Sequence, residues 1–246
     1  MPKFFIKKEN IKNNIVTITG QDATHISKVL RHNAGDIITL CDGEGTDFSA
    51  QITDCTKDSV VLEITDTIPC TAEPGVLVTL FQGLPKQGKM DYIIEKCTEL
   101  GISRIVPVSM KRSVVKIEDK KSEAKKLERW RKIAQESVKQ CGRGKIPEIT
   151  EVMTTDEAIR FSATLDITIA AYENEKEVSL KSVLEKHTPE SIGIFIGPEG
   201  GLDDKEIDKI KAAGIPAVTL GKRILRTETA GHTVLGAIMY EYNEFE

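Results

Sequence analysis

Two glycine-containing turns, each following a short apolar run, constrain how the C-terminal part of this chain can fold. The first apolar run, 194–196, ends at the segment 197–201, whose sequence is GPEGG. Asp203 follows, and Glu206 stands three residues later, which is the spacing of a capping box at the start of a helix. The segment therefore predicts a strand, a glycine loop and a capped helix in that order.

The second turn repeats this order further along the chain. The run 217–220 is strand-like and ends at Gly221, and the loop 222–226 leads to Thr227, which we expect to cap a final helix. Strands that alternate with helices belong to one parallel sheet, so their loops meet at the same edge. We therefore expect two strands that end beside each other in loops.

The glycines in these loops favour a ligand-binding role. Glycine is used where φ must be positive or where the backbone must approach a ligand closely. A tight turn alone would explain Gly200 and Gly201, but a second turn of the same design favours a ligand. Neither phosphate-binding pattern, G-x-x-x-x-G-K-[ST] or G-x-G-x-x-G, is present, and Glu199 would repel a phosphate. We expect a ligand whose contacting edge is neutral or cationic.

Composition is that of a globular protein and excludes several classes. Of 246 residues, 39% are hydrophobic and 29% are charged, so disorder is not expected. No apolar run reaches the length of a membrane helix, and the segment 1–8 lacks the apolar core of a signal peptide, so we expect a cytoplasmic protein without membrane contact. The cysteines lie far apart, without a C-x-x-C pair, so neither a metal site nor a disulfide framework is expected.

The pattern of short and long apolar segments predicts two domains. Residues 1–70 contain short strand-like pieces and one helix at about 22–32, which favours a small β-barrel. The stretch 65–75 contains two prolines and no periodicity, so it is expected to be a linker. Strands alternate with helices over 75–246, which predicts an α/β domain with a parallel sheet covered on both faces.

Charge is unevenly distributed along the chain. Residues 1–72 carry seven basic and ten acidic side chains, and residues 146–246 carry ten basic and nineteen acidic ones. The segment 111–145 is different, because thirteen Lys or Arg residues stand there against five acidic residues. Such a cluster attracts a phosphate backbone even when net charge is negative, although it is also compatible with the solvated face of a long helix over 122–141. We favour RNA as the partner of this segment.

Several segments together resemble a known protein family. The two signature segments are 196–201 (IGPEGG) and 220–230 (LGKRILRTETA), and they are supported by 25–31 (HISKVLR), 89–101 and 140–143 (QCGR). These segments resemble the RsmE family, bacterial methyltransferases of the SPOUT superfamily. The resemblance implies S-adenosylmethionine as the cofactor and N3 of a specific uridine in 16S ribosomal RNA of the small subunit as the methylated atom.

The resemblance also implies features that spacing alone does not reveal. Topology rules predict an unknotted sheet for the second domain, whereas the resemblance implies a C-terminal trefoil knot and a homodimer. It makes the first domain a PUA-like RNA-binding β-barrel. The substrate would be free small-subunit ribosomal RNA or the assembled subunit. The basic residues expected to contact it are Lys3, Lys28, Arg31, Lys89, Arg112 and Arg143.

The cofactor is expected to bind where the two glycine loops and a third strand end meet. Main-chain groups of the loops would hold the adenine and ribose, and leucine and isoleucine side chains would form an apolar wall. No metal is needed for methyl transfer, because positioning does most of the work. The residues expected at this site are Ala171, Tyr172, Ile196, Gly197, Gly200, Gly201, Leu220, Gly221, Ile224, Leu225, Thr227 and Ala230.

A uracil N3 carries a proton at neutral pH, so the reaction needs a general base. Glu199 is the acidic residue in the first loop, and Arg226 is placed to stabilise negative charge that develops on the uracil. Glu228 is the rival base, although an acidic residue in the first turn of a helix also stabilises that helix. Glu199 has a structural alternative too, in which it only braces the loop.

Two other function classes are compatible with parts of the sequence. A non-catalytic RNA-binding protein would use the first domain and the basic segment, but it would not need two glycine loops. A phosphotransferase would use such loops, but it should carry a lysine or hydroxyl at the loop end and carboxylates for magnesium. S-adenosylmethionine binding, compared with ATP binding, separates these classes.

Overall fold

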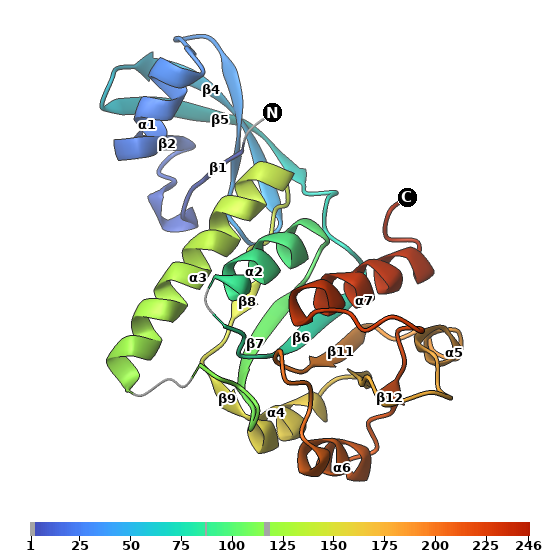
Figure 1. Ribbon diagram of the computed structural model, residues 1–246. Helices are drawn as coiled ribbons and strands as arrows, with labels where there is room; N and C mark the ends of the chain where they lie inside the picture. The colour runs from blue at the N-terminus through green and yellow to red at the C-terminus, as the bar shows by residue number, and fades with distance from the viewer. Residues whose placement is uncertain (1–2, 87, 116–118) are drawn as a thin grey trace. The chain divides into compact units, whose positions relative to one another are not determined.

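The computed structural model describes residues 3–86, 88–115 and 119–246 (Figure 1). The chain forms two compact units, one made of residues up to Glu73 with Val138–Ile146, and the other of Pro74–Ser137 with Pro147–Glu246. The expectation of a second domain over 75–246 did not include the return of 138–146 to the first unit. The reason lies in Glu73, whose Oε1 accepts the backbone N–H groups of Gly144 and Lys145, each at 2.8 Å.

The first unit is a curled five-stranded sheet with a short helical segment. Its strands follow the order β1-β3-β4-β5-β2, with β1 parallel to β3 and the other neighbours antiparallel. Register shifts between β4 and β5 mark irregular pairing, which increases local twist and helps the sheet to curl. The strands are β1 (Lys3–Phe5), β2 (Ile15–Thr19), β3 (Ile37–Cys41), β4 (Thr46–Cys55) and β5 (Ser59–Pro69).

Alternation in these strands builds the core of the first unit. Val16 and Ile18 of β2 and Val60 and Leu62 of β5 are buried, while their neighbours along each strand are more exposed. The single helix expected at 22–32 is instead α1 (Gly20–Thr24) followed by a π-helical turn over His25–Val29. A short 3-10 turn occupies Lys8–Asn10. The small β-domain expected from the sequence is therefore confirmed.

The second unit is a parallel sheet covered by helices on both faces. Its strands follow the order β12-β10-β11-β6-β7-β8, with β9 also pairing with β7, and every pairing is parallel. The strands are β6 (Leu77–Gly83), β7 (Arg104–Ser109), β8 (Glu148–Ile149), β9 (Met153–Thr154), β10 (Ile167–Ala171), β11 (Ser191–Ile196) and β12 (Ala217–Val218). The expected α/β domain is confirmed.

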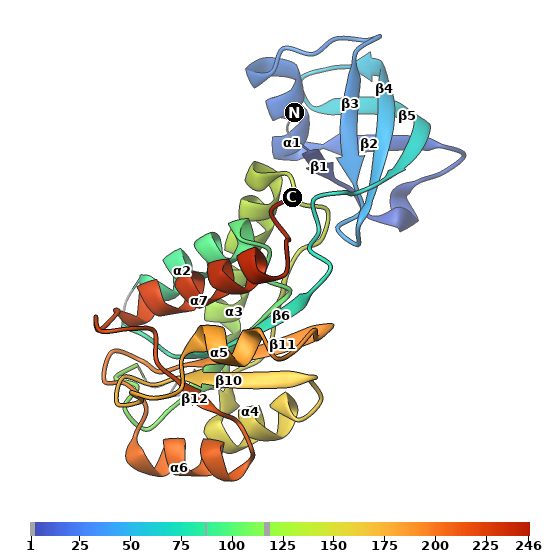
Figure 2. The same cartoon turned by 90° about the vertical axis from the view of Figure 1, so that its right-hand side faces the viewer.

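Helices α2 (Lys89–Glu99) and α7 (Thr227–Glu241) lie on one face of this sheet, and α4 (Thr155–Ser162) and α6 (Asp204–Ala212) lie on the other (Figure 2). Side chains alternate accordingly: Phe81 stacks on Phe195 with ring centroids 4.4 Å apart, in the same core cluster as residues of α4 and α6. The remaining helices are α3 (Lys120–Cys141) and α5 (Leu180–Leu184).

The last part of the chain crosses the sheet. Strand β12 pairs with β10 at one edge, yet the following helix α7 packs against α2, β6 and β11. The trefoil knot implied by the resemblance stays a prediction.

Of the two helix caps predicted from the sequence, one is confirmed and the other is wrong. Asp203 and Glu206 form the expected capping box of α6. Thr227 is not the cap of α7, because the capping position is Arg226 and it makes no side-chain cap bond. The Thr227 hydroxyl is used elsewhere, as described below.

Candidate active site

The carboxyl ends of β12, β10, β11 and β6 lie side by side at one edge of the sheet. In register, Ala171 pairs with Val218 on one side and with Ile196 on the other, and Ile196 pairs with Gln82. The loops that follow these strands therefore meet. Ligands of open α/β sheets bind outside the carboxyl ends of the strands, so this edge is the candidate active site.

The loop after β11 is tightly folded on itself. Gly201 has φ +69° and its N–H donates to the Pro198 carbonyl at 2.9 Å. A Cβ on Gly197 would come within 2.8 Å of the backbone of Gly201 and Leu202. Glycine at these positions is thus needed partly so that the loop can fold on itself. This folding fixes the direction in which the main-chain N–H and C=O groups of the loop point.

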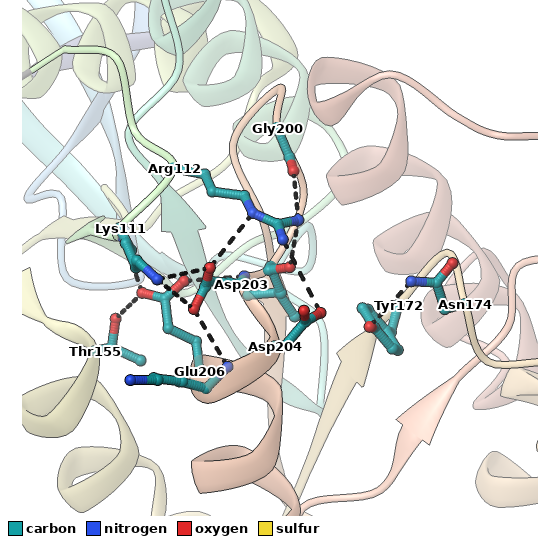
Figure 3. Close-up of polar contacts among 11 residues, drawn as sticks. Lys111, Arg112, Thr155, Tyr172, Asn174, Gly200, Asp203, Asp204 and Glu206 are labelled. Atoms are coloured by element: carbon teal, nitrogen blue, oxygen red, sulfur yellow. Dashed lines mark hydrogen bonds and ion pairs between the residues drawn. The ribbon is translucent and has the colours of Figure 1, made fainter.

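Arg112 and Lys111 hold this loop from the neighbouring segment after β7 (Figure 3). Nη1 of Arg112 donates to the Gly200 carbonyl at 3.1 Å and to the Leu202 carbonyl at 3.0 Å. Nζ of Lys111 lies 3.0 Å from both carboxylate oxygens of Asp203. Arg112, expected to contact RNA, is therefore engaged with the glycine loop, a supporting role that sequence reasoning missed.

Thr227 connects three elements through its hydroxyl. Its Oγ1 donates to the Gly197 carbonyl at 2.6 Å and accepts from Nε2 of Gln82 at 2.9 Å. Gln82 is fully buried at the end of β6. A polar residue near the end of an apolar strand is the feature of the sequence that could have pointed to Gln82 as part of this site. The contact ties the first glycine loop to the start of α7.

Thr227→Val is expected to lower the free energy of unfolding by about 1–3 kcal/mol, because Gln82 Nε2 and the Gly197 carbonyl would each lose a buried partner. Urea unfolding monitored by circular dichroism measures this. Thr227→Ser keeps the hydroxyl and should restore most of the loss, and Thr229→Val is the matched control on the same helical turn. Equal stability of Thr227→Val and Thr229→Val would contradict the structural role of the hydroxyl.

The loop after β12 exposes apolar side chains at the same edge. Gly221 has φ +99°, and a Cβ there would meet no heavy atom within 4 Å. Ile224 is 86% exposed, whereas Leu220 and Leu225 are half-buried. An exposed isoleucine on the same loop as an open glycine suits the apolar ligand wall that the sequence predicts, and this wall stays a prediction.

Other expected cofactor residues differ in burial. The side chains of Ile196 and Ala230 are buried, at 2% and 7% exposure, so they support the site from inside the core. Ala171 and Tyr172 are half-buried at the end of β10, and the Tyr172 hydroxyl accepts from Nδ2 of Asn174 at 3.0 Å. The strand end that carries them is thus in place beside both loops.

Lys89 joins the two candidate bases. Its Nζ lies 3.2 Å from Oε1 of Glu199 and 2.9 Å from Oε2 of Glu228, and Glu199 also accepts the Lys86 N–H at 2.9 Å. The Arg226 side chain is 82% exposed, with Nη1 4.0 Å from Glu228. Lys89 was expected to contact RNA; the structure pairs its ammonium with both carboxylates, and the RNA contact stays a prediction.

These contacts lower the pKa of both carboxyl groups. Burial acts to raise the pKa of Glu199, but the backbone N–H of Lys86 and the ammonium of Lys89 outweigh it. The same holds for the pKa of Glu228, where burial is outweighed by its own N–H and by Lys89. Hydrogen bonds that Lys89 donates to Glu228 and Glu199 raise the pKa of Lys89 in turn, and the burial of the ammonium opposes them. All three groups are therefore charged at neutral pH.

The other expected RNA contacts fall into two groups. Lys3 is paired with Asp47 at 2.6 Å, and Arg143 is only 4% exposed and paired with Glu73 at 2.8 Å, so neither placement fits an RNA contact. Lys28 and Arg31 are exposed. Among the contacts described for residues 3–86, 88–115 and 119–246, neither of these two side chains has an ion pair.

In the part of the chain that the structure describes, no three His, Cys, Asp or Glu residues are grouped so that they could hold a metal ion. Over the same residues, the search for a helix long and apolar enough to cross a membrane finds none.

Comparison with known proteins identifies the family. A family model of the RNA methyltransferase domain matches residues 72–239, and a model of the RNA methyltransferase PUA domain matches residues 18–65. The ribosomal RNA small subunit methyltransferase E of Bacillus subtilis is 35% identical, with 98% of this chain and 97% of the relative covered. The chain belongs to the ribosomal RNA small subunit methyltransferase E family.

Solved structures of similar proteins agree with this family. The ribosomal RNA small subunit methyltransferase E of Neisseria gonorrhoeae, bound to S-adenosylmethionine, is 30% identical with a TM-score of 0.84, covering 98% of this chain and 97% of that one. A methyltransferase of Legionella pneumophila in complex with the same cofactor is 29% identical with a TM-score of 0.84, covering 97% and 96%. The predicted family and the predicted pair of domain types are confirmed.

Proposed function

We propose that this protein transfers the methyl group of S-adenosylmethionine to N3 of a uridine in 16S ribosomal RNA of the small subunit. One observation carries the proposal beyond family membership: the glycine loops after β11 and β12 and the end of β10 meet at one sheet edge. The proposed substrate is the free RNA or the assembled small subunit, and the proposed location is the cytoplasm.

The residues at this edge fit the cofactor. Gly197, Gly200 and Gly201 lie on a loop that Arg112 braces through the Gly200 carbonyl, and Gly221 leaves open space on the opposite loop. Leu220, Ile224 and Leu225 provide an apolar wall suited to an adenine. When bound, S-adenosylmethionine supplies an electrophilic methyl group. The residues proposed to hold it are Ala171, Tyr172, Ile196, Gly197, Gly200, Gly201, Leu220, Gly221, Ile224, Leu225, Thr227 and Ala230.

The protein's own charged groups would manage the uracil proton. A carboxylate accepts a proton, whereas a guanidinium can only donate hydrogen bonds. Glu199 is the proposed base and Glu228 its rival, because both are ionised beside Lys89. The exposed Arg226 is proposed to stabilise negative charge on the uracil carbonyl oxygens.

Two measurements on one purified sample test the proposal. Calorimetry should detect binding of S-adenosylmethionine and none of ATP, and incubation with small-subunit RNA and cofactor should produce 3-methyluridine in a nuclease digest. A protein that binds RNA but neither ligand would be a non-catalytic RNA-binding protein. Binding of ATP alone would favour a phosphotransferase.

A homodimer and the C-terminal knot belong to the same proposal. Both come from the family resemblance. Sedimentation equilibrium at micromolar concentration is expected to give twice the mass of 27.2 kDa. A monomer with full methyltransferase activity would contradict the dimer.

The exposed face of α3 is proposed to contact the RNA backbone. Lys121, Lys125 and Lys132 are exposed and share one helical face. Arg129 is less suited than the sequence suggested, since it is paired with Asp91, and Lys116 of the same basic segment lies outside the described residues.

Changing Lys121, Lys125 and Lys132 to Glu is expected to weaken RNA binding and to lower the slope of log Kd against log salt concentration by about 2–3, because each phosphate contact releases counterions. Filter binding over a range of salt concentrations measures the slope. Cofactor affinity serves as the control and should not change. An unaltered slope would make this helix face merely solvated surface.

A further inference from the structure

We infer that the carboxylate of Glu173, on the loop after β10, binds the vicinal hydroxyl groups of the cofactor ribose; this rests on the proposed function. Glu173 follows Ala171 by two positions, and β10 is the strand that lies between β11 and β12. Its loop is therefore the one that adjoins both glycine loops. Sequence reasoning stopped at Tyr172 and did not include this glutamate.

The glutamate lies directly against the first glycine loop. A Cβ on Gly201 would overlap Oε1 of Glu173 and would lie 3.0 Å from its Cδ. The carboxylate thus occupies the side of Gly201 that only glycine leaves open. The φ of +69° favours glycine at position 201, and a Cβ there would also have to displace the end of the Glu173 side chain.

The carboxylate has no protein partner to explain its position. Glu173 is exposed, and no hydrogen bond or ion pair with another described residue engages its carboxylate. Three neighbouring acidic groups are engaged: Glu199 and Glu228 pair with Lys89, and Asp203 pairs with Lys111. Glu173, which lies against the first glycine loop, is therefore available as an acceptor for a ligand.

Hydrogen bonds within the loop hold the backbone that follows Glu173. Oε1 of Glu175 accepts the N–H groups of Lys176 and Glu177, each at 3.0 Å, and the Glu175 N–H donates to the Tyr172 carbonyl at 3.1 Å. Tyr172 and Asn174 are joined by the hydrogen bond drawn in Figure 3. The backbone that carries the acceptor therefore has little conformational entropy to lose on binding.

The ligand group that binds this carboxylate is expected to carry two hydrogen-bond donors. An ionised carboxylate only accepts hydrogen bonds and offers two oxygens, so its partner must present donors. A vicinal diol presents two O–H groups on adjacent carbons, and acidic side chains bind ribose hydroxyls in this way at other parallel-sheet nucleotide sites. The cofactor's ammonium group is the competing donor, and the ligand series below separates the two.

The test is calorimetric affinity for three ligands that share the ribose: S-adenosylmethionine, S-adenosylhomocysteine and 5′-methylthioadenosine, the last of which lacks the amino-acid end. Glu173→Gln is expected to weaken all three by roughly 10- to 100-fold, since it removes a charged acceptor while keeping the shape. A 2′-deoxyribose analogue of the thioadenosine should bind wild type more weakly and should lose no further affinity in the variant. Glu177→Gln, an exposed neighbour with the same charge change, is the matched control.

Each outcome separates the inference from the proposed function. Wild-type binding of S-adenosylmethionine with unaltered affinity in Glu173→Gln would leave the function in place and overturn the role of Glu173. If Glu173→Gln lowers the affinity for S-adenosylmethionine and S-adenosylhomocysteine but not for 5′-methylthioadenosine, the carboxylate binds the ammonium group of the amino-acid end. That result also overturns the inference. Failure of wild type to bind any of them would contradict the proposed function itself.

Discussion

Gly201→Val is expected to abolish measurable S-adenosylmethionine binding while the protein stays folded. A β-branched residue at φ +69° is strained by about 1–3 kcal/mol, and its Cβ would displace the Glu173 carboxylate from the loop. Both effects act at the edge where the cofactor is proposed to bind. We expect at least a roughly 100-fold loss of affinity in calorimetry, equivalent to about 2.7 kcal/mol.

Gly214→Val is the matched control for this prediction. Gly214 also has a positive φ, +81°, but it follows α6 and a Cβ there would meet no heavy atom within 4 Å. It should lose a similar amount of thermal stability and retain cofactor affinity. Affinity equal to wild type in Gly201→Val would remove the first loop from the site. Gly221→Val extends the test to the second loop, where a Cβ would meet no heavy atom within 4 Å, although the φ of +99° adds strain of its own.

Sequence patterns predicted the parts of this fold that depend on local periodicity. The continuous apolar run of β11 predicted a strand buried on both faces, and all of its residues after Ser191 are buried. The spacing of Asp203 and Glu206 predicted the capping box, because a cap involves only residues of the same turn. Such features need no knowledge of distant contacts.

Features that depend on partners far apart in the sequence were not predictable. Thr227 appeared to be a helix cap, but its hydroxyl bonds to Gly197 and Gln82, which only the folded sheet brings near. Composition counted Arg143 as an available charge, yet Glu73 pairs with it in a buried position. Charge counts describe the number of basic groups but not how many remain unpaired after folding.

Glu199→Gln is expected to reduce turnover by roughly 10²- to 10⁴-fold while cofactor affinity stays nearly unchanged. The amide keeps the shape and can still accept the Lys86 N–H, so the loop should hold its conformation. What is lost is the proton acceptor for uracil N3. Raising the pH should partly restore the rate, because more of the uracil is then deprotonated by solvent. Single-turnover methylation as a function of pH measures both effects.

Lys89→Met tests the electrostatic part of the same mechanism. The ammonium of Lys89 helps to lower the pKa of Glu199 against the opposing effect of burial, so in wild type the carboxylate stays ionised down to a lower pH. Removing the charge should raise that pKa and move the acidic limb of the kcat/KM profile to higher pH. Glu228→Gln is the companion variant, because it removes the other carboxylate while leaving Glu199 paired with Lys89.

The competing structural role of Glu199 predicts a different set of results. If the carboxylate only braces the loop through Lys86, Glu199→Gln should lose cofactor affinity and show no recovery at high pH. That result would transfer the base role to Glu228, provided that Glu228→Gln shows the loss of turnover with rescue. If neither variant is rescued, no carboxylate takes the proton, and the exposed Arg226 together with Lys89 would have to lower the pKa of the uracil by favouring its anion. Arg226→Gln would then cause the largest loss of rate. This loss would diminish as the pH rises toward the pKa of the uracil N3 in free uridine.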